Sequence, residues 1–168
     1  MRLARLITSP LSAVGLIACL WLWSLAAAGA ADSLPLPRFV SLKSSEVNLR
    51  TGPGKRYPID WVYHRRGLPV EIIAEFDNWR RVRDSEGVVG WVHHALLSGR
   101  RGALVALPER IFRRAPEIGA QALFQAATGV LVEIISCDGV WCKVSHDGTN
   151  AWTKQSGLWG VYPGEVIE

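Results

Sequence analysis

The chain has 168 residues, which is enough for one ordinary domain or two very small ones. Its formal charge is only +4, and so small a surplus favours solubility over attraction to an anionic surface. Hydrophobic residues make up 49% of the chain, but that share includes an N-terminal leader that does not belong to the fold.

The leader has the pattern of a secretory signal peptide. Two arginines precede a mostly apolar run from Leu6 through Ala31, and small residues crowd the end of that run. We predict a signal peptide over residues 1–30, cleaved after Ala30 or Ala31, and an extended linker over residues 31–37. The mature protein is then periplasmic or secreted, has no membrane span, and carries a formal charge of +2 after losing the two leader arginines.

Two other fates of the leader stay open. The apolar run is long enough to span a membrane as an uncut anchor. The tetrapeptide Leu16-Ile17-Ala18-Cys19 resembles a bacterial lipobox, which would make Cys19 a lipidation site. A lipidated cysteine normally closes the apolar run, whereas here the run continues past it, so cleavage is the interpretation we favour.

The stretch Val47–Gly54 reads Val-Asn-Leu-Arg-Thr-Gly-Pro-Gly and predicts a strand that enters a tight loop. Apolar and polar residues alternate along its first half, which is the period of a half-buried strand. The Gly-Pro-Gly sequence then supplies the restricted and positive dihedrals of a turn. The loop continues to Asp60 and carries one aromatic residue, Tyr57.

Further strands follow at short intervals, separated by turn residues. They are predicted at residues 61–63, 68–76, 79–83 and 88–92, with one short helical turn at residues 93–97. In the longest of these strands, the alternation places Val70, Ile72, Ala74 and Phe76 on one face.

The chain matches itself when it is shifted by about 62 residues. The aligned pairs are 67–73 with 129–135, 79–82 with 141–144, Trp91 with Trp152 and, at a shift of 63, 49–53 with 112–116. The mature protein is therefore predicted to contain two copies of one β module, over residues 38–100 and 101–168.

Each copy has several short strands, two tryptophans at matching places and no convincing helix, which is typical of small barrels. We predict an all-β fold of two tandem barrels that pack together, because a module of about 60 residues is only marginally stable alone. A single sandwich through the whole chain is the alternative. The turn-rich boundary at residues 98–102 argues against it.

Export leaves Cys137 and Cys142 where disulfides persist, without a third thiol. The Asp-Gly sequence between them marks a hairpin, so the sulfurs would meet across neighbouring strands. We predict a disulfide. Two cysteines and the nearby His146 do not supply the four ligands of structural zinc, and no metal or other cofactor is predicted.

Motifs at both ends of the first copy resemble the bacterial SH3-like (SH3b) domain family. They are Asn48–Gly54, a later Gly-x-x-Val with a following Trp, and Gly90-Trp91-Val92. Residues 91–101 look like the branch found in exported proteobacterial proteins, commonly in tandem. The resemblance covers about residues 38–167 and implies SH3-like barrels of about five strands with a binding role, often toward cell-wall peptidoglycan or as an appendage of wall hydrolases.

The second copy departs from these motifs, with Ala115-Pro116-Glu117 for the Gly-Pro-Gly turn and Ala151-Trp152-Thr153 for Gly-Trp-Val. We therefore expect the first copy to bind and the second to brace it. The candidate ligand contacts are Arg50, Tyr57, Trp61, Trp79 and Trp91. Packing within the barrel is the alternative for the tryptophans, and a hold on loop carbonyls is the alternative for Arg50.

No catalytic constellation is recognisable, so the protein is not expected to be an enzyme. Adjacent His93 and His94 should diverge, and a metal site from His64 and His93 is the alternative to surface or capping roles for the histidines. Four arginine pairs could suggest nucleic acid, but export argues against that partner and leaves envelope anions within reach. We expect an envelope module that binds peptidoglycan; the alternative is an adaptor for an envelope protein.

Overall fold

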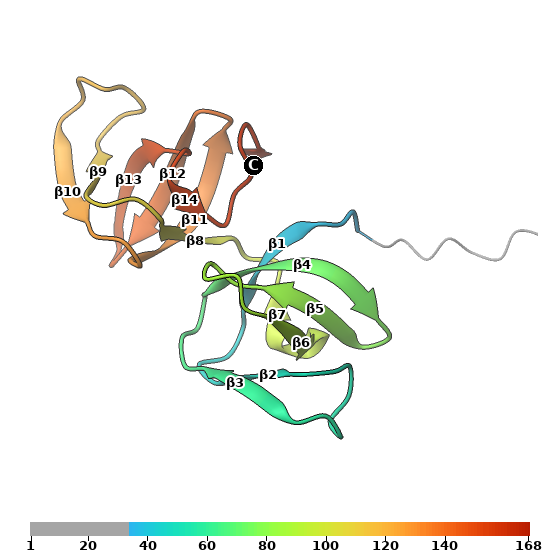
Figure 1. Ribbon diagram of the computed structural model, residues 1–168. Coiled ribbons are helices and arrows are strands. Elements are labelled where there is room, and N and C mark those ends of the chain that lie inside the picture. Colours follow the sequence, from blue (N-terminus) through green and yellow to red (C-terminus); the bar gives the residue numbers. More distant parts are fainter. Residues whose placement is uncertain (1–33) are drawn as a thin grey trace, which may run out of the picture. The chain divides into compact units, whose positions relative to one another are not determined.

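The computed structural model describes residues 34–168, so the predictions made for the leader, including Cys19, lie outside the described residues. The described chain is nearly all β, as predicted, and forms two antiparallel sheets that follow each other in sequence (Figure 1). Within residues 34–168, no helix is long and apolar enough to cross a membrane.

The first sheet is built from residues 38–98. Its elements are β1 (Arg38–Leu42), β2 (Val47–Arg50), β3 (Ile59–Tyr63), β4 (Pro69–Phe76), β5 (Trp79–Arg83), β6 (Val89–His93), the 3-10 turn η1 (His94–Leu96) and β7 (Leu97–Ser98). The strands lie in the order β3-β2-β6-β5-β4-β1-β7. The strands β2 to β6 fall where the alternation and turn residues predict strands.

The second sheet is built from residues 102–167. Its strands are β8 (Gly102–Val105), β9 (Arg110–Arg113), β10 (Ala122–Ala126), β11 (Leu131–Asp138), β12 (Trp141–His146), β13 (Thr149–Lys154), β14 (Leu158–Trp159) and β15 (Val166–Ile167). The order is β10-β9-β13-β12-β11-β8-β14, with β15 paired to β11. Adding seven to each strand number of the first sheet reproduces the second order, so the predicted duplication is confirmed.

Each copy has its own core, formed by the inward side chains of its strands. The first core contains Leu42, Val47, Leu49, Tyr63, Val70, Ile72, Val82 and Val92. The second contains Phe112, Val132, Val144 and both disulfide cysteines, among others. Because burial of one large aliphatic side chain stabilises a fold by about 1.5–3 kcal/mol, a core of this size can hold a small barrel together.

The prediction that Val70, Ile72, Ala74 and Phe76 share one face of β4 is only half right. Val70 and Ile72 are buried, but Phe76 is 60% exposed. The pairing of β4 with β5 shifts register between Ile72 and Ala74, and the extra residue of such a bulge reverses the alternation beyond it. The second copy repeats the shift in β11, between Ile134 and Ser136.

Cys137 and Cys142 lie opposite each other on β11 and β12 and form the predicted disulfide. At the corresponding place in the first copy, Glu75 and Arg80 lie opposite each other on β4 and β5. Arg80 Nε is 2.9 Å from Glu75 Oε1, and Arg38 pairs with the same carboxylate. An ion-pair cluster in one copy therefore occupies the position of the covalent bond in the other.

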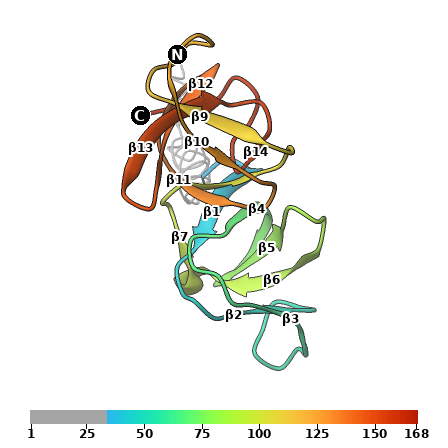
Figure 2. The ribbon, with the colours of Figure 1, turned by 90° about the vertical axis from the view of Figure 1, so that its left-hand side faces the viewer.

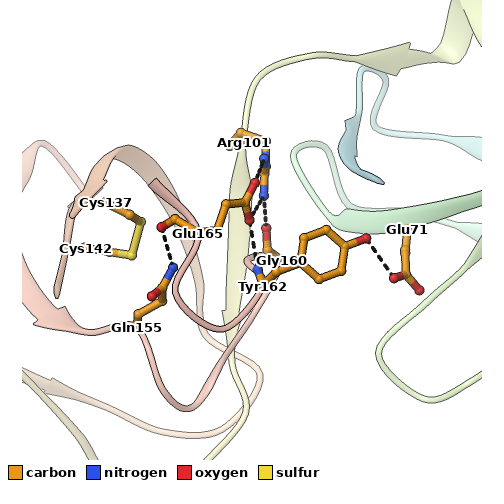
Figure 3. Close-up of polar contacts among 8 residues, drawn as sticks. All are labelled: Glu71, Arg101, Cys137, Cys142, Gln155, Gly160, Tyr162 and Glu165. Carbon is orange, nitrogen blue, oxygen red and sulfur yellow. Dashed lines mark hydrogen bonds and ion pairs between the residues drawn. A yellow bond between two sulfur atoms is a disulfide. The ribbon is translucent and has the colours of Figure 1, made fainter. Parts of the chain in front are cut away.

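The segment after β13 contacts the first copy. Tyr162 donates its hydroxyl hydrogen to Glu71 Oε1 at 2.9 Å (Figure 3). The Phe39 ring packs against Trp159 and Tyr162, with centroids 5.1 and 4.8 Å away. Arg101 holds this segment in place through two hydrogen bonds to the Glu165 carboxylate, of 2.7 and 3.0 Å.

Candidate functional site

The loop between β2 and β3, residues 51–58, is held by the arginine at its start. Arg50 donates from Nη1 to the carbonyl oxygen of Tyr57 at 2.8 Å and, more weakly, to that of Lys55 at 3.3 Å. In the second copy, Arg113 donates to the carbonyl oxygen of Ala120 at 2.8 Å. The guanidinium of Arg50 is thus engaged inside its own loop, which is the structural alternative considered for it.

Tyr57 packs inside the same loop. A Cβ atom added to Gly52 would lie 2.5 Å from the Tyr57 ring, so this position accepts only glycine unless the ring moves. The Arg56 guanidinium lies 5.1 Å from the centroid of the Tyr57 ring and donates a hydrogen bond to the hydroxyl at 3.2 Å. The tyrosine therefore organises the loop while its hydroxyl stays at an exposed contact.

Trp79 and Trp91 lie on the hairpin of β5 and β6, on the side away from the core. Trp79 is opposite His93 and Trp91 is opposite Arg81, whereas Val82 and Val92 point into the core. Residues directly opposite each other in a sheet share a face. Neither tryptophan belongs to the core of the first copy.

Strands β2 and β3 extend this face, since β2 lies beside β6 (Figure 2). Arg50 is opposite Trp91 and also opposite Ile59, which is 47% exposed. We call the resulting surface the outer face. Its residues are Arg50, Ile59, Trp79, Arg81, Trp91 and His93.

Trp61 does not belong to the outer face. It lies opposite the buried Leu49, because the pairing of β2 with β3 shifts register between Leu49 and Arg50. Since β3 is the last strand of the sheet, the tryptophan has little cover and is 57% exposed. The five predicted contacts are therefore divided between the outer face, the loop and the opposite side of the edge strand.

The second copy carries a corresponding face. Trp152 is opposite both Arg113 and Lys143, and Trp141 is opposite Lys154, whose Nζ is 6.0 Å from the tryptophan ring centroid. Both copies thus combine two tryptophans with basic or histidine neighbours. The sequence prediction missed Arg81 and His93, although their two-residue spacing from Trp79 and Trp91 was a usable signal.

The histidines of the first copy were predicted to diverge at positions 93 and 94, with a His64–His93 metal site as the alternative role. The His93 and His94 rings lie 4.9 Å apart with 34° between their planes, so the expectation that they diverge was wrong. The 3-10 turn that begins at His94 changes the direction of the chain there. Among residues 34–168, no three His, Cys, Asp or Glu side chains gather as metal ligands.

The chain matches one protein-family model and is similar to several solved structures. The family model described as Bacterial SH3 domain matches residues 43–99 and 108–160. Among solved structures, the chain is similar to NlpC2 of Trichomonas vaginalis, with 14% identity, a TM-score of 0.34, and coverage of 76% of this chain and 49% of that one. It is also similar to an NLPC/P60 family protein of Bacillus cereus, with 15% identity, a TM-score of 0.33, and coverage of 72% of this chain and 55% of that one. The chain spans about half the length of these structures, and no curated protein matches it.

Proposed function

The chain belongs to the bacterial SH3 domain family, and from this premise we propose that it is a non-enzymatic module that binds cell-wall peptidoglycan through its first copy. The family and the disulfide between Cys137 and Cys142 both indicate a protein that works outside the cytoplasm. The observation that carries the proposal is the outer face, where Trp79 and Trp91 stand on the solvent side of the sheet instead of filling the core.

The outer face has the chemistry that such a ligand needs. Trp79 and Trp91 offer broad apolar rings that can pack on sugar rings or on the side chains of a peptide. The guanidinium of Arg81, opposite Trp91, can hold a carboxylate with two parallel hydrogen bonds. Peptidoglycan combines glycan chains with peptides that carry carboxylates. Tyr57, on the adjoining loop, and Trp61, at the sheet edge, remain further proposed contacts.

Co-sedimentation with purified sacculi tests the proposal. We expect the native protein to pellet with sacculi, most strongly at low salt, where charge contacts are least screened. Trp91→Ala should weaken the apparent affinity by at least about tenfold, as for an aromatic anchor of a binding site. Trp152→Ala, at the corresponding place in the second copy, is the matched control and should change it by less than about twofold. Native protein left in the supernatant at low salt would exclude wall binding.

A protein adaptor is the second candidate, and the edge strand of the first sheet favours it. The strand β3 has a neighbour on one side only and exposes Ile59 and Trp61. Such an edge can accept an added strand from a partner. A photo-crosslinking residue in place of Trp61 distinguishes the two functions in cells, because an adaptor should capture one dominant protein and a wall binder should capture muropeptides.

A further inference from the structure

We propose that the cleft between the two copies binds a phosphate-bearing ligand. The cleft has a volume of about 550 Å³, within the usual range for small-molecule sites. Both copies supply its walls, which include Lys43, Arg65 and Arg66 from the first copy, Arg100 and Arg101 from the connection, and His146 from the second. Neither barrel alone would form this site, which is separate from the outer face.

Contacts between the copies fix the walls of the cleft. Ser41 Oγ accepts a hydrogen bond from the buried backbone nitrogen of Gly102 at 3.0 Å. A side chain at Gly102 would collide with the carbonyl oxygen of Gly67, so the close approach requires glycine there. Across the cleft, Arg65 donates to the carbonyl oxygen of Gly129 at 2.9 Å. The arrangement is thus formed before any ligand arrives.

The cleft holds more positive than negative charge. Its lining contains five lysines and arginines but only two carboxylates, those of Glu133 and Asp147. Arg101 is already paired with Glu165, which lies outside the lining. In the described part of the chain, Lys43, Arg66 and Arg100 form no ion pair, and Arg65 is bonded to a neutral carbonyl. These cations repel one another, and a bound anion would relieve the repulsion.

Phosphate fits this arrangement better than a carboxylate does. A terminal phosphate carries up to two negative charges and three oxygens, so it can accept hydrogen bonds from Arg66 and Arg100 on different walls at once. A carboxylate offers two oxygens in one plane, which suits a single guanidinium. The phosphate could come from a soluble phosphate compound or from a lipid head group, and the two sources share this chemistry.

Calorimetric titration with inorganic pyrophosphate as the probe tests the inference. The full chain is expressed, and the protein is purified in the form that the cell produces from it. The native protein should bind pyrophosphate saturably. The double variant Arg66→Gln with Arg100→Gln should bind about tenfold or more weakly, since two charge-assisted contacts are lost. Both side chains are exposed and unpaired among residues 34–168, so the variant should fold normally.

The matched control is Lys55→Gln with Arg114→Gln, which removes the same charge from exposed sites outside the cleft lining. It should leave pyrophosphate affinity within about twofold. The absence of saturable binding by the native protein, or an equal loss in both double variants, would overturn the inference. Vesicles of phosphatidic acid, compared with phosphatidylcholine, identify the source: cleft-dependent pelleting indicates a head group, and binding of pyrophosphate alone indicates a soluble phosphate.

The same variants separate this inference from the proposed function. The variant with Arg66→Gln and Arg100→Gln should pellet with sacculi as the native protein does. Trp91→Ala should bind pyrophosphate normally. Loss of wall binding in the cleft variant would show that the cleft belongs to the wall-binding site, and it would overturn the inference of a separate phosphate site.

Discussion

Tyr57 packs its ring against Gly52 in the first copy, whereas the corresponding positions of the second copy hold Ala120 and Ala115. The glycine is needed because the ring occupies the space of a side chain. In the second copy the ring is absent, and alanine fits. The arginine hold on the loop is common to both copies, so the requirement for glycine at position 52 comes from the Tyr57 ring and not from the arginine.

Gly52→Ala tests this relation. The added methyl group must displace the Tyr57 ring, so we expect the free energy of unfolding to fall by about 1–3 kcal/mol in urea titrations. Gly119→Ala is the matched control in the corresponding loop of the second copy, since no atom lies within 4 Å of its added Cβ. It should change stability by less than about 0.5 kcal/mol. Equal changes in the free energy of unfolding for the two variants would show that the Tyr57 ring is not the reason for glycine at position 52.

Tyr63 gives the first copy a dependence on alkaline pH. Burial, together with the 2.9 Å hydrogen bond to Asp84 Oδ2, raises the pKa of Tyr63 well above its ordinary value. The folded protein therefore keeps this proton to a higher pH than the unfolded chain does. The resulting stability is complete below about pH 10 and is lost as the pH rises further, because the unfolded state ionises first.

Tyr63→Phe should lower the free energy of unfolding at neutral pH by about 1–3 kcal/mol, since the buried Asp84 loses a partner. It should also reduce the loss of stability above about pH 10. Some pH dependence will remain, because burial and the hydrogen bond to Glu71 raise the pKa of Tyr162 as well. Urea titrations across this pH range give the slope, and identical slopes for the two proteins would exclude this role for Tyr63.

At the scale of the elements, the β4–β5 and β11–β12 hairpins share a bulge but are fastened differently. Cys137 and Cys142 are almost completely buried, whereas the Glu75 and Arg80 side chains are 23% and 20% exposed. An ion pair with this exposure contributes little, on the order of 1 kcal/mol or less. A disulfide acts chiefly by restricting the unfolded chain.

Cys137→Ala with Cys142→Ala should lower the free energy of unfolding by about 2 kcal/mol under oxidising conditions, the value expected for so short a closed loop. Under reductant, the variant and the native protein should have similar stability. Glu75→Gln is the comparison in the first copy and should cost about 1 kcal/mol or less. Thermal unfolding with and without reductant measures both, and equal melting of the oxidised proteins would contradict the predicted contribution.

On the scale of the whole molecule, the C-terminal segment couples the two copies. Phe39 of the first copy packs on Trp159 and Tyr162, and Glu71 accepts a hydrogen bond from the Tyr162 hydroxyl. Glu71 is only 3% exposed and also pairs with Arg83, so this contact links a buried charge to the far end of the chain. Two small barrels joined in this way should unfold together.

Phe39→Ala should uncouple them. We expect one calorimetric transition for the native protein and two for the variant, with the free energy of unfolding of the first copy lowered by about 3–5 kcal/mol. Phe76→Ala, which removes a ring that is 60% exposed, is the control and should keep a single transition. A single transition in Phe39→Ala at unchanged temperature would show that these rings do not couple the copies.

Much of the fold could be predicted because its signals are local. Strand alternation, turn residues and the self-match lie within short windows or within aligned stretches of sequence, and they predict the two barrels. Cys137 and Cys142 are five residues apart, so a hairpin turn is enough to pair them. The bulge in β4 was missed because the apolar residues continue at every second position from Val70 to Phe76, although the bulge changes which face they occupy.

The candidate site depends on register, which local patterns do not determine. Arg50, Trp79 and Trp91 meet on one face because β2, β6 and β5 are neighbours in the sheet, while a register shift places Trp61 on the other side. The sequence by itself determined the strands, the duplication and the disulfide, through interactions between near neighbours in the chain. Only the tertiary structure decided the outer face, the basic cleft and the hydrogen bond from Tyr162 to Glu71. These features join residues from separate strands and copies, and their pairing depends on the packing of the whole chain.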